Sequence, residues 1–203
     1  MGVQILNKDV SVISSILSKP KANIGNVGGI GGWAGGGPAS QGPFVPATAV
    51  EINDGYNNWV GVNNIQNNTN DNIYAGCTLI SIQQANPIKV TNFGFNIPTS
   101  ATINGIIAQV NKFADNTYYD SNITLVKGGV QAGTNKASVY SWPANSLSPE
   151  TYGSSTDLWG TTWSPADINN SNFGFYIFGY GSFQKHYYEV NLAWVKITVH
   201  YTT

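Results

Sequence analysis

Side chains capable of covalent chemistry are few in this 203-residue sequence. It holds two histidines, His186 and His200, and one cysteine, Cys77. None of them stands in a Gly-x-Ser-x-Gly turn, a phosphate-binding loop or a helical pair of zinc ligands. Cys77 lies in an apolar, strand-like context, which favours a buried small side chain over a nucleophile. We therefore expect a protein that is not an enzyme and that carries no cofactor.

The acidic residues offer weaker alternatives. Asp115 and Asp120 flank one predicted loop, and Glu51 and Asp54 share another. A glycosidase needs two carboxylates across a cleft, but any all-β chain with ten acidic residues could supply a pair. The stretches 115–122 and 67–72 offer oxygen ligands that calcium accepts, without the spacing of a known calcium loop. We interpret both as solvated turns and predict no metal site.

Aromatic side chains offer more serious binding chemistry. Rings with an apolar face and a polar edge suit sugar rings, and asparagine supplies hydrogen-bond donors beside them. A candidate platform for a host surface glycan consists of three tryptophans and four tyrosines: Trp142, Trp159, Trp163, Tyr118, Tyr119, Tyr187 and Tyr188. Tryptophan in a β-sandwich also covers the edges of the core, and we prefer that interpretation.

Composition excludes several classes of partner. Charged residues make up 9% of the chain, against roughly 25% in ordinary soluble domains. The net charge is −1 and there is no arginine, so the basic footprint of a nucleic-acid-binding protein is missing. The sequence has neither a polybasic patch for anionic lipid nor an apolar run long enough to span a membrane. With so little net charge, copies of the protein repel one another only weakly, which favours a protein that works inside an assembly.

The last strand is the element around which the others are placed. Apolar and polar residues alternate from Val195 to Tyr201, which predicts a half-buried strand. The phase is opposite from Val190 to Trp194, so we expect a bulge, or burial on both faces, between the two segments. The aromatic run 173–180 predicts a second strand, and the short connection 181–186 predicts a hairpin between the two.

Further strands are expected upstream, with turns rich in Gly, Pro and Asn between them. Asn104-Gly105 predicts a bulge or bend inside one of them. Ser164-Pro-Ala-Asp167 predicts a short helical turn with Ser164 as its N-cap. No long helix is expected, so the fold class is all-β, a sandwich or barrel. The expected strands are 59–62, 73–82, 88–97, 101–113, 123–127 and 137–142.

Residues 1–46 differ from the rest of the chain. Glycine is dense between 28 and 38, and ordering glycine costs the most backbone entropy. This segment is nevertheless too apolar for a plain solvated linker, so its large side chains must fold back on their own domain or dock on a partner. We favour an assembly arm that grips a neighbour through Ile5, Leu6, Ile13, Ile16, Leu17, Ile24, Ile30 and Trp33.

Six motifs, fairly specific as a set, run through the C-terminal part of the chain: Asn92–Ile106, Ile123–Gly129, Gly133–Ala137, Tyr152–Trp163, Ala166–Gly174 and Val195–Thr202. Together they resemble a β-sandwich, jelly-roll-like module of virion structural proteins from tailed bacteriophages. The resemblance covers 59–203, with 59–75 its weaker leading part. It implies a place in the virion and supplies no catalytic residues.

The prediction is a jelly-roll-like β-sandwich domain, residues 47–203, behind an extended, Gly-rich N-terminal arm, residues 1–46. Its predicted function is that of a virion structural protein, a capsid decoration, head-fibre, neck or tail appendage subunit assembled in the bacterial cytoplasm. Other virion proteins are the expected partners, and a homo-oligomer is expected. The alternative is a receptor-recognition module of a tail fibre that binds host glycan.

Overall fold

The computed structural model describes residues 36–67, 73–79, 84–181 and 187–203. The chain divides into two compact units. One unit comprises Met1–Gly37 with Thr203, and the other comprises Pro38–Thr202. The predicted arm residues, from Ile5 to Trp33, lie outside the described residues. Among the described residues no helix is long and apolar enough to cross a membrane.

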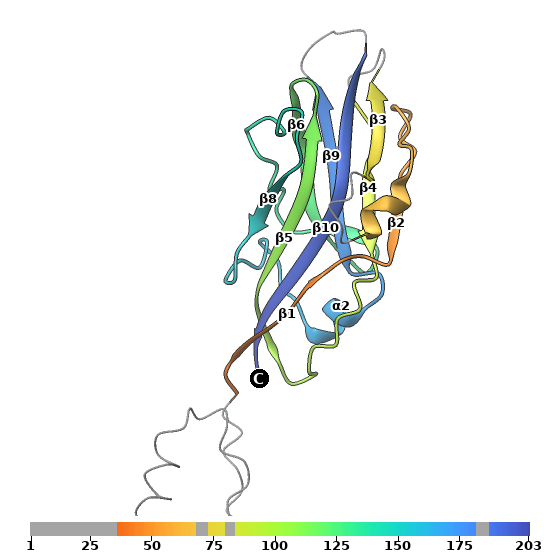
Figure 1. Ribbon diagram of the computed structural model, residues 1–203. Helices are drawn as coiled ribbons and strands as arrows, with labels where there is room; N and C mark the ends of the chain where they lie inside the picture. Colours follow the sequence, from red (N-terminus) through yellow and green to blue (C-terminus); the bar gives the residue numbers. More distant parts are fainter. Residues whose placement is uncertain (1–35, 68–72, 80–83, 182–186) are drawn as a thin grey trace, which may run out of the picture. The chain divides into compact units, whose positions relative to one another are not determined.

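The unit Pro38–Thr202 is a sandwich of two antiparallel five-stranded sheets (Figure 1). The all-β class and the sandwich are therefore confirmed. The first sheet runs β1-β10-β5-β8, with β3 paired to the other half of the β10 edge that β1 occupies, and the second runs β2-β4-β9-β6-β7. The first sheet consists of β1 (Pro38–Phe44), β3 (Ala75–Leu79), β5 (Thr102–Ala114), β8 (Ser148–Gly153) and β10 (Tyr188–Thr202). The second consists of β2 (Thr48–Glu51), β4 (Ile88–Thr91), β6 (Tyr118–Lys127), β7 (Val130–Ala132) and β9 (Gly174–Gly181).

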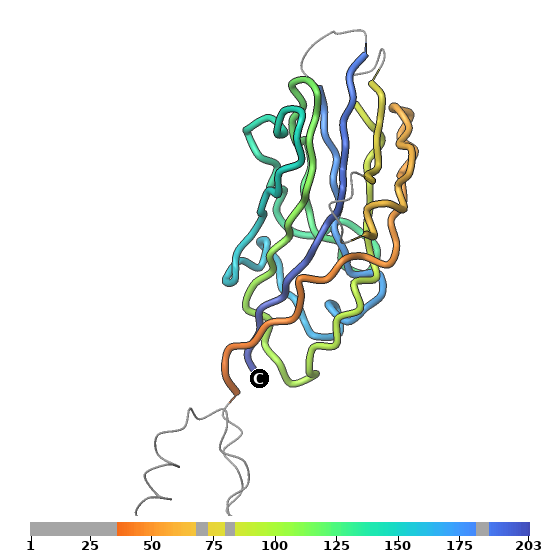
Figure 2. The backbone as a smooth tube through the Cα atoms, viewed as in Figure 1, coloured from red at the N-terminus to blue at the C-terminus, as the bar shows by residue number. Residues whose placement is uncertain are grey.

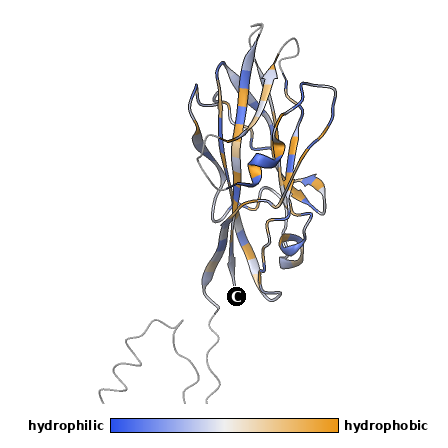
Figure 3. Ribbon diagram, turned by 45° about the vertical axis from the view of Figure 1, so that its right-hand side comes forward, coloured by the Kyte–Doolittle hydropathy of each residue, from blue (hydrophilic) through white to orange (hydrophobic). Residues whose placement is uncertain are grey.

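The last strand has the predicted register. From Val195 to Tyr201 the apolar side chains of β10 are buried, while the alternating Lys196, Thr198 and His200 are partly exposed. The expected bulge lies between Leu192 and Trp194, where pairing with β5 shifts. A second bulge in the same pair falls at Asn104, as Asn104-Gly105 predicts. Figure 3 shows how hydropathy alternates along the strands.

The predicted hairpin between the last two strands is wrong. β9 pairs with β4 and β6 in the second sheet, whereas β10 pairs with β5, β1 and β3 in the first. The connection between them therefore passes from one sheet to the other. A short loop can join two paired strands of one sheet, or it can lead from one sheet to the other. Pairing with distant strands decides which connection forms.

Three of the expected strands also differ. The segment 137–142 forms one isolated bridge, between Ser141 and Tyr119, and exposes Tyr140. The segment 59–62 contributes one bridge and then continues into the 3₁₀ helix η2 (Val62–Gln66). β4 ends at Thr91 because Asn92 has a φ of 62°, which no strand ladder accepts. The predicted helical turn forms as α2 (Pro165–Asn169).

The start of the sandwich precedes the boundary expected at residue 47. β1 pairs with β10 from Pro38, which lies opposite Thr202, to Phe44, which lies opposite Ile197. Figure 2 shows β1 running beside the end of β10. Its glycine and proline residues make this segment look like part of the arm, but an edge strand tolerates both. Residues 38–46 thus belong to the described sandwich unit.

Candidate functional site

The three tryptophans of the candidate glycan platform lie inside the sandwich. Trp142 is 3% exposed, Trp159 0% and Trp163 8%. Their indole N–H groups donate to Asp120, to the backbone oxygen of Ile106 and to that of Leu158, respectively. A side chain with its ring packed and its one donor already used offers nothing to a sugar. These tryptophans therefore do not form a surface platform, because each completes the core.

The oxygen-rich stretch 115–122 is not the solvated turn that we predict from the sequence, because β6 begins at Tyr118 and only 115–117 precede it. Asp115 accepts a hydrogen bond from the backbone N–H of Glu189, and Asn116 accepts one from Thr117. Asp120 lies within β6, is buried and accepts a hydrogen bond from Lys112. The second candidate calcium stretch, 67–72, lies outside the described residues except for Asn67. Within the described residues no group of three or more Asp, Glu, His or Cys could hold a metal ion.

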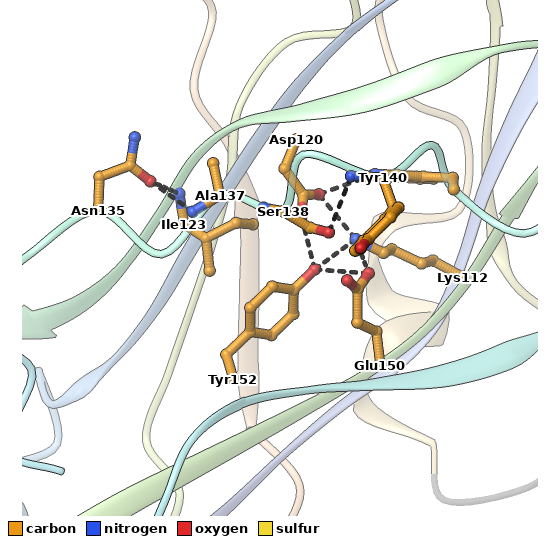
Figure 4. Close-up of polar contacts among 10 residues, drawn as sticks. Lys112, Asp120, Ile123, Asn135, Ala137, Ser138, Tyr140, Glu150 and Tyr152 are labelled. Atoms are coloured by element: carbon orange, nitrogen blue, oxygen red, sulfur yellow. Dashed lines mark hydrogen bonds and ion pairs between the residues drawn. The ribbon is translucent and has the colours of Figure 1, made fainter.

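The most concentrated chemistry of the sandwich is a buried polar cluster between its sheets. It comprises Lys112, Asp120, Trp142, Glu150 and Tyr152, and we call it the inter-sheet cluster (Figure 4). The first sheet contributes Lys112 from β5 and both Glu150 and Tyr152 from β8. Asp120 comes from β6 of the second sheet. Alternation along each strand directs these side chains into the space between the sheets.

Lys112 lies at the centre of the inter-sheet cluster. Its Nζ is 2.7 Å from Asp120 Oδ1 and 2.9 Å from Glu150 Oε2, and it also donates to Tyr152 Oη. The side chains of Lys112 and Asp120 have no exposed surface, while that of Glu150 is 28% exposed. The Nζ lies 4.7 Å from the centroid of the Trp142 ring and 5.2 Å from that of Tyr152. The amine is thus enclosed by two aromatic rings and two carboxyl groups.

Every oxygen of Asp120 is occupied. Oδ1 accepts from Lys112 Nζ and from the Trp142 indole N–H at 2.8 Å. Oδ2 lies 2.7 Å from Tyr152 Oη and accepts the backbone N–H of Ser138 at 3.1 Å. Tyr152 Oη is also 2.9 Å from Glu150 Oε2, and its single proton serves one of these two carboxyl groups at a time. Burial and the negative charge of Asp120 raise the pKa of Tyr152, so this side chain stays protonated.

No sequence motif predicts the inter-sheet cluster, although the pattern of β5 contains one signal for it. Ile106, Ala108, Val110, Lys112 and Ala114 occupy alternate positions of β5, and all are buried. A lysine in phase with four inward apolar residues must itself point inward. A buried lysine requires a buried partner, but the sequence does not show which acid supplies it.

Outside the core, the second sheet presents a row of aromatic side chains. The rings of Tyr119 and Tyr180 have centroids 5.6 Å apart, and those of Tyr56 and Phe178 are stacked at 5.4 Å. Phe178 and Tyr180 are two positions apart on β9 and share its outer face, so the four rings form one row, the outer aromatic row. All four are at least partly exposed. Of the tyrosines predicted for a glycan platform, Tyr119 belongs to this row, whereas Tyr118 and Tyr188 are buried.

A cleft of about 550 Å³ lies at the end of the sandwich where β1 begins. Pro38 and Ala39 of β1 line it together with His200 and Tyr201 of β10 and Asn104 of β5. The Nε2 atom of His200 is buried and has no hydrogen-bond partner among the described residues. The start of the sandwich and its last strand thus meet beside a hollow surface.

Comparisons with known proteins find similarity only at the level of solved structures. No protein-family model and no curated protein matches the chain. A structure described as "CBM4 structure and function" is 12% identical, with a TM-score of 0.35 over 64% of this chain and 85% of its own. The capsid asymmetric unit of cyanophage Pam1 is 12% identical, with a TM-score of 0.30 over 91% of this chain and 97% of its own. Neither similarity assigns a function, so we infer the function from the residues of this chain.

Proposed function

We propose that the chain is a structural subunit of a tailed-bacteriophage virion, with the sandwich displayed and the N-terminal arm attached to neighbouring virion proteins. One observation carries the proposal. The sandwich begins with an edge strand whose first residue, Pro38, pairs with Thr202, next to the last residue of the chain. The segment before Pro38 therefore continues into the sandwich at the end where β1 pairs with the end of β10.

The arm has the composition of a docking segment. Residues such as Ile13, Ile16 and Leu17 bring apolar surface, and burial of that surface against a neighbour contributes roughly 25 cal/mol per Å². Ordering the glycine-rich part opposes this gain. Several copies that act together on one particle multiply the attachment. Assembly as a homo-oligomer or on another virion protein is therefore part of the proposal.

The test of attachment is deletion of residues 1–34. The remaining chain contains every described residue, so we expect it to be soluble and to keep the β-sheet circular dichroism of the full chain. Added to particles that lack the subunit, it should fail to join them, whereas the full chain should bind. Normal incorporation of the truncated protein would reject the arm. An image of the intact particle with the subunit located separates a head position from a neck or tail position.

A second function, binding of a host surface glycan, is supported by the outer aromatic row. Its rings offer apolar faces for sugar rings. Beside them the side-chain amide of Asn122 donates to that of Gln131 at 2.8 Å, and both residues are at least partly exposed on the same sheet. Few residues of the chain are charged, which suits the binding of an uncharged sugar. This site differs from the tryptophan platform expected from the sequence.

The test of glycan binding is Tyr180→Ala, with Tyr140→Ala as the matched control. Tyr180 is 41% exposed and stacks within the row, whereas Tyr140, next to the Ser141 bridge to Tyr119, is 79% exposed and is not one of the four rings of the row. Binding of the purified protein to host cells should fall about tenfold with Tyr180→Ala, since one stacked ring contributes on the order of 1 kcal/mol. Binding should be unchanged with Tyr140→Ala. Equal binding by both variants would exclude the row as the site.

A further inference from the structure

We propose that Lys112 and Asp120 condense spontaneously to an isopeptide bond between the two sheets, with Glu150 as the proton-transfer residue. The proposal concerns a covalent modification and is independent of what the subunit attaches to. It stands on the inter-sheet cluster, where an amine and a carboxyl group without exposed surface are in direct contact, and where a second carboxyl group, 28% exposed, contacts the same amine.

The buried position makes the charged pair reactive. Removing an ammonium and a carboxylate from water is costly, and transfer of one proton gives an uncharged amine and an uncharged acid that carry less of this penalty. Those uncharged forms are the ones that condense to an amide. The fixed contact between the amine and the carboxyl group increases the reaction rate further, because well-positioned intramolecular partners reach effective molarities of roughly 10⁵ M or more. The two rings around Lys112 Nζ keep competing water away.

The step balances without any co-reactant. Lys112 Nζ forms a bond to Asp120 Cγ, and Glu150, 2.9 Å from that nitrogen, accepts a proton from it. The C–O bond of one Asp120 oxygen then breaks, Glu150 returns a proton to the departing oxygen, and one water molecule leaves. The other oxygen becomes the amide oxygen. Oδ2 suits this role because the Ser138 N–H and Tyr152 O–H beside it stabilise negative charge in the transition state.

The same chain supplies internal controls. Lys136 and Asp157 are 2.6 Å apart, closer than Lys112 and Asp120, but their side chains are 24% and 28% exposed. Lys127 and Asp167 are 3.0 Å apart and are exposed to 34% and 26%. Neither pair has a second carboxyl group within salt-bridge distance of the lysine among the described residues. If short distance were sufficient, an isopeptide bond would form in all three pairs. The proposed mechanism predicts it only between Lys112 and Asp120, which are buried.

The experiment is peptide mass analysis of the full-length protein after denaturation and trypsin digestion. Trypsin does not cleave at an acylated lysine, so residues 90–127 should appear as one peptide, lighter than its sequence by one water. Fragmentation should yield no backbone ions that separate 112 from 120. Ordinary cleavage is expected after Lys127 and Lys136. Ring closure at Asn104-Gly105 would remove ammonia instead of water, so accurate mass distinguishes the two reactions.

The variant Glu150→Gln keeps the shape of the side chain and removes the proton acceptor. It should give separate peptides ending at Lys112, with no loss of water, while Glu189→Gln on the exposed start of β10 should behave as the wild type. The wild-type mass decides the matter even if Glu150→Gln fails to fold. A peptide ending at Lys112 as the sole product from aged wild-type protein would overturn the proposal. A bridge from Lys112 to Glu150 would overturn the assigned roles.

Discussion

Trp159 is the largest fully buried side chain among the described residues. Its ring packs edge-on against Phe175, and its N–H donates to the Ile106 backbone at 2.9 Å. We predict that Trp159→Ala destabilises the sandwich by about 3–5 kcal/mol, because it leaves a cavity and an unpaired carbonyl. Urea unfolding followed by circular dichroism measures the loss. A surface role would instead leave the unfolding midpoint unchanged and affect binding only.

Cys77 illustrates the same burial for a reactive group. Burial, and after it the negative charge of Glu51, raise the pKa of the Cys77 thiol to about 12. We predict that the native protein does not react with a disulfide reagent at neutral pH and that it reacts once per chain in denaturant, because only the thiolate attacks. Absorbance of the released thiol measures both. As a control, Val139→Cys, at a side chain 83% exposed, should add one native equivalent.

Single residues also show what the sequence can and cannot reveal. Asp157 and Asp167 each brace a turn, because they accept the backbone N–H groups of Trp159 and Ser164, respectively. Such contacts are local, so a motif predicts them. The inter-sheet cluster joins residues that are 8 and 40 positions apart. A sequence shows that Lys112 points inward, but the partner depends on how two sheets face one another.

At the scale of the element, the stability of α2 depends on the hydrogen bonds of its first turn. Ser164 Oγ accepts the Asp167 N–H at 3.2 Å, and Asp167 Oδ2 accepts the Ser164 N–H at 2.8 Å. Lys127 Nζ lies 3.0 Å from the same carboxylate. Burial raises the pKa of Asp167, but the hydrogen bonds from Ser164 and the Lys127 ammonium outweigh it and hold the pKa below its ordinary value. The ionised carboxylate therefore stabilises the folded state.

This predicts a pH dependence with a definite sign. A lowered folded-state pKa contributes stability above the unfolded-state pKa, near 3.8, and the contribution is lost as pH falls through the folded-state value. We expect Asp167→Asn to melt several degrees below the wild type at neutral pH, and the gap to narrow when both proteins are acidified below about pH 4. Calorimetry at both pH values measures it. Asp54→Asn, at an exposed turn, should show little gap at either.

The elements also mark the limit of pattern reading. Alternation and turn chemistry locate β10, both of its bulges against β5 and the α2 cap, because these depend on neighbouring residues. The predicted hairpin of β9 and β10 fails, and β8 goes unrecognised. The reason is that strand choice depends on partners far along the chain. β8 reads as Ser-Pro-Glu-Thr-Tyr-Gly, with one buried side chain, and becomes a strand only because β5 offers it an edge.

At the scale of the whole molecule, few charges and a glycine-rich apolar segment act together. With a net charge of −1, neither long-range attraction nor repulsion contributes much to assembly. The sandwich core already buries its apolar residues within the unit Pro38–Thr202. Apolar side chains such as Val60, Val130 and Val139 remain exposed on the sandwich, and we propose that those of the arm add the main contacts with neighbours. Association between subunits should therefore depend on the burial of apolar surface rather than on charge.

We predict that self-association of the full chain barely changes between about 0.01 M and about 1 M salt, where screening removes most charge interactions. It should weaken on cooling, since the hydrophobic contribution falls with temperature. Analytical ultracentrifugation can distinguish apolar contacts of the arm from charge contacts of the sandwich. It compares the full chain with a chain lacking residues 1–34 and with a triple variant, Ile13→Ser, Ile16→Ser, Leu17→Ser. Both altered chains should sediment as monomers at concentrations where the full chain associates. Dissociation of the full chain by salt would instead locate the contacts on the charged surface of the sandwich.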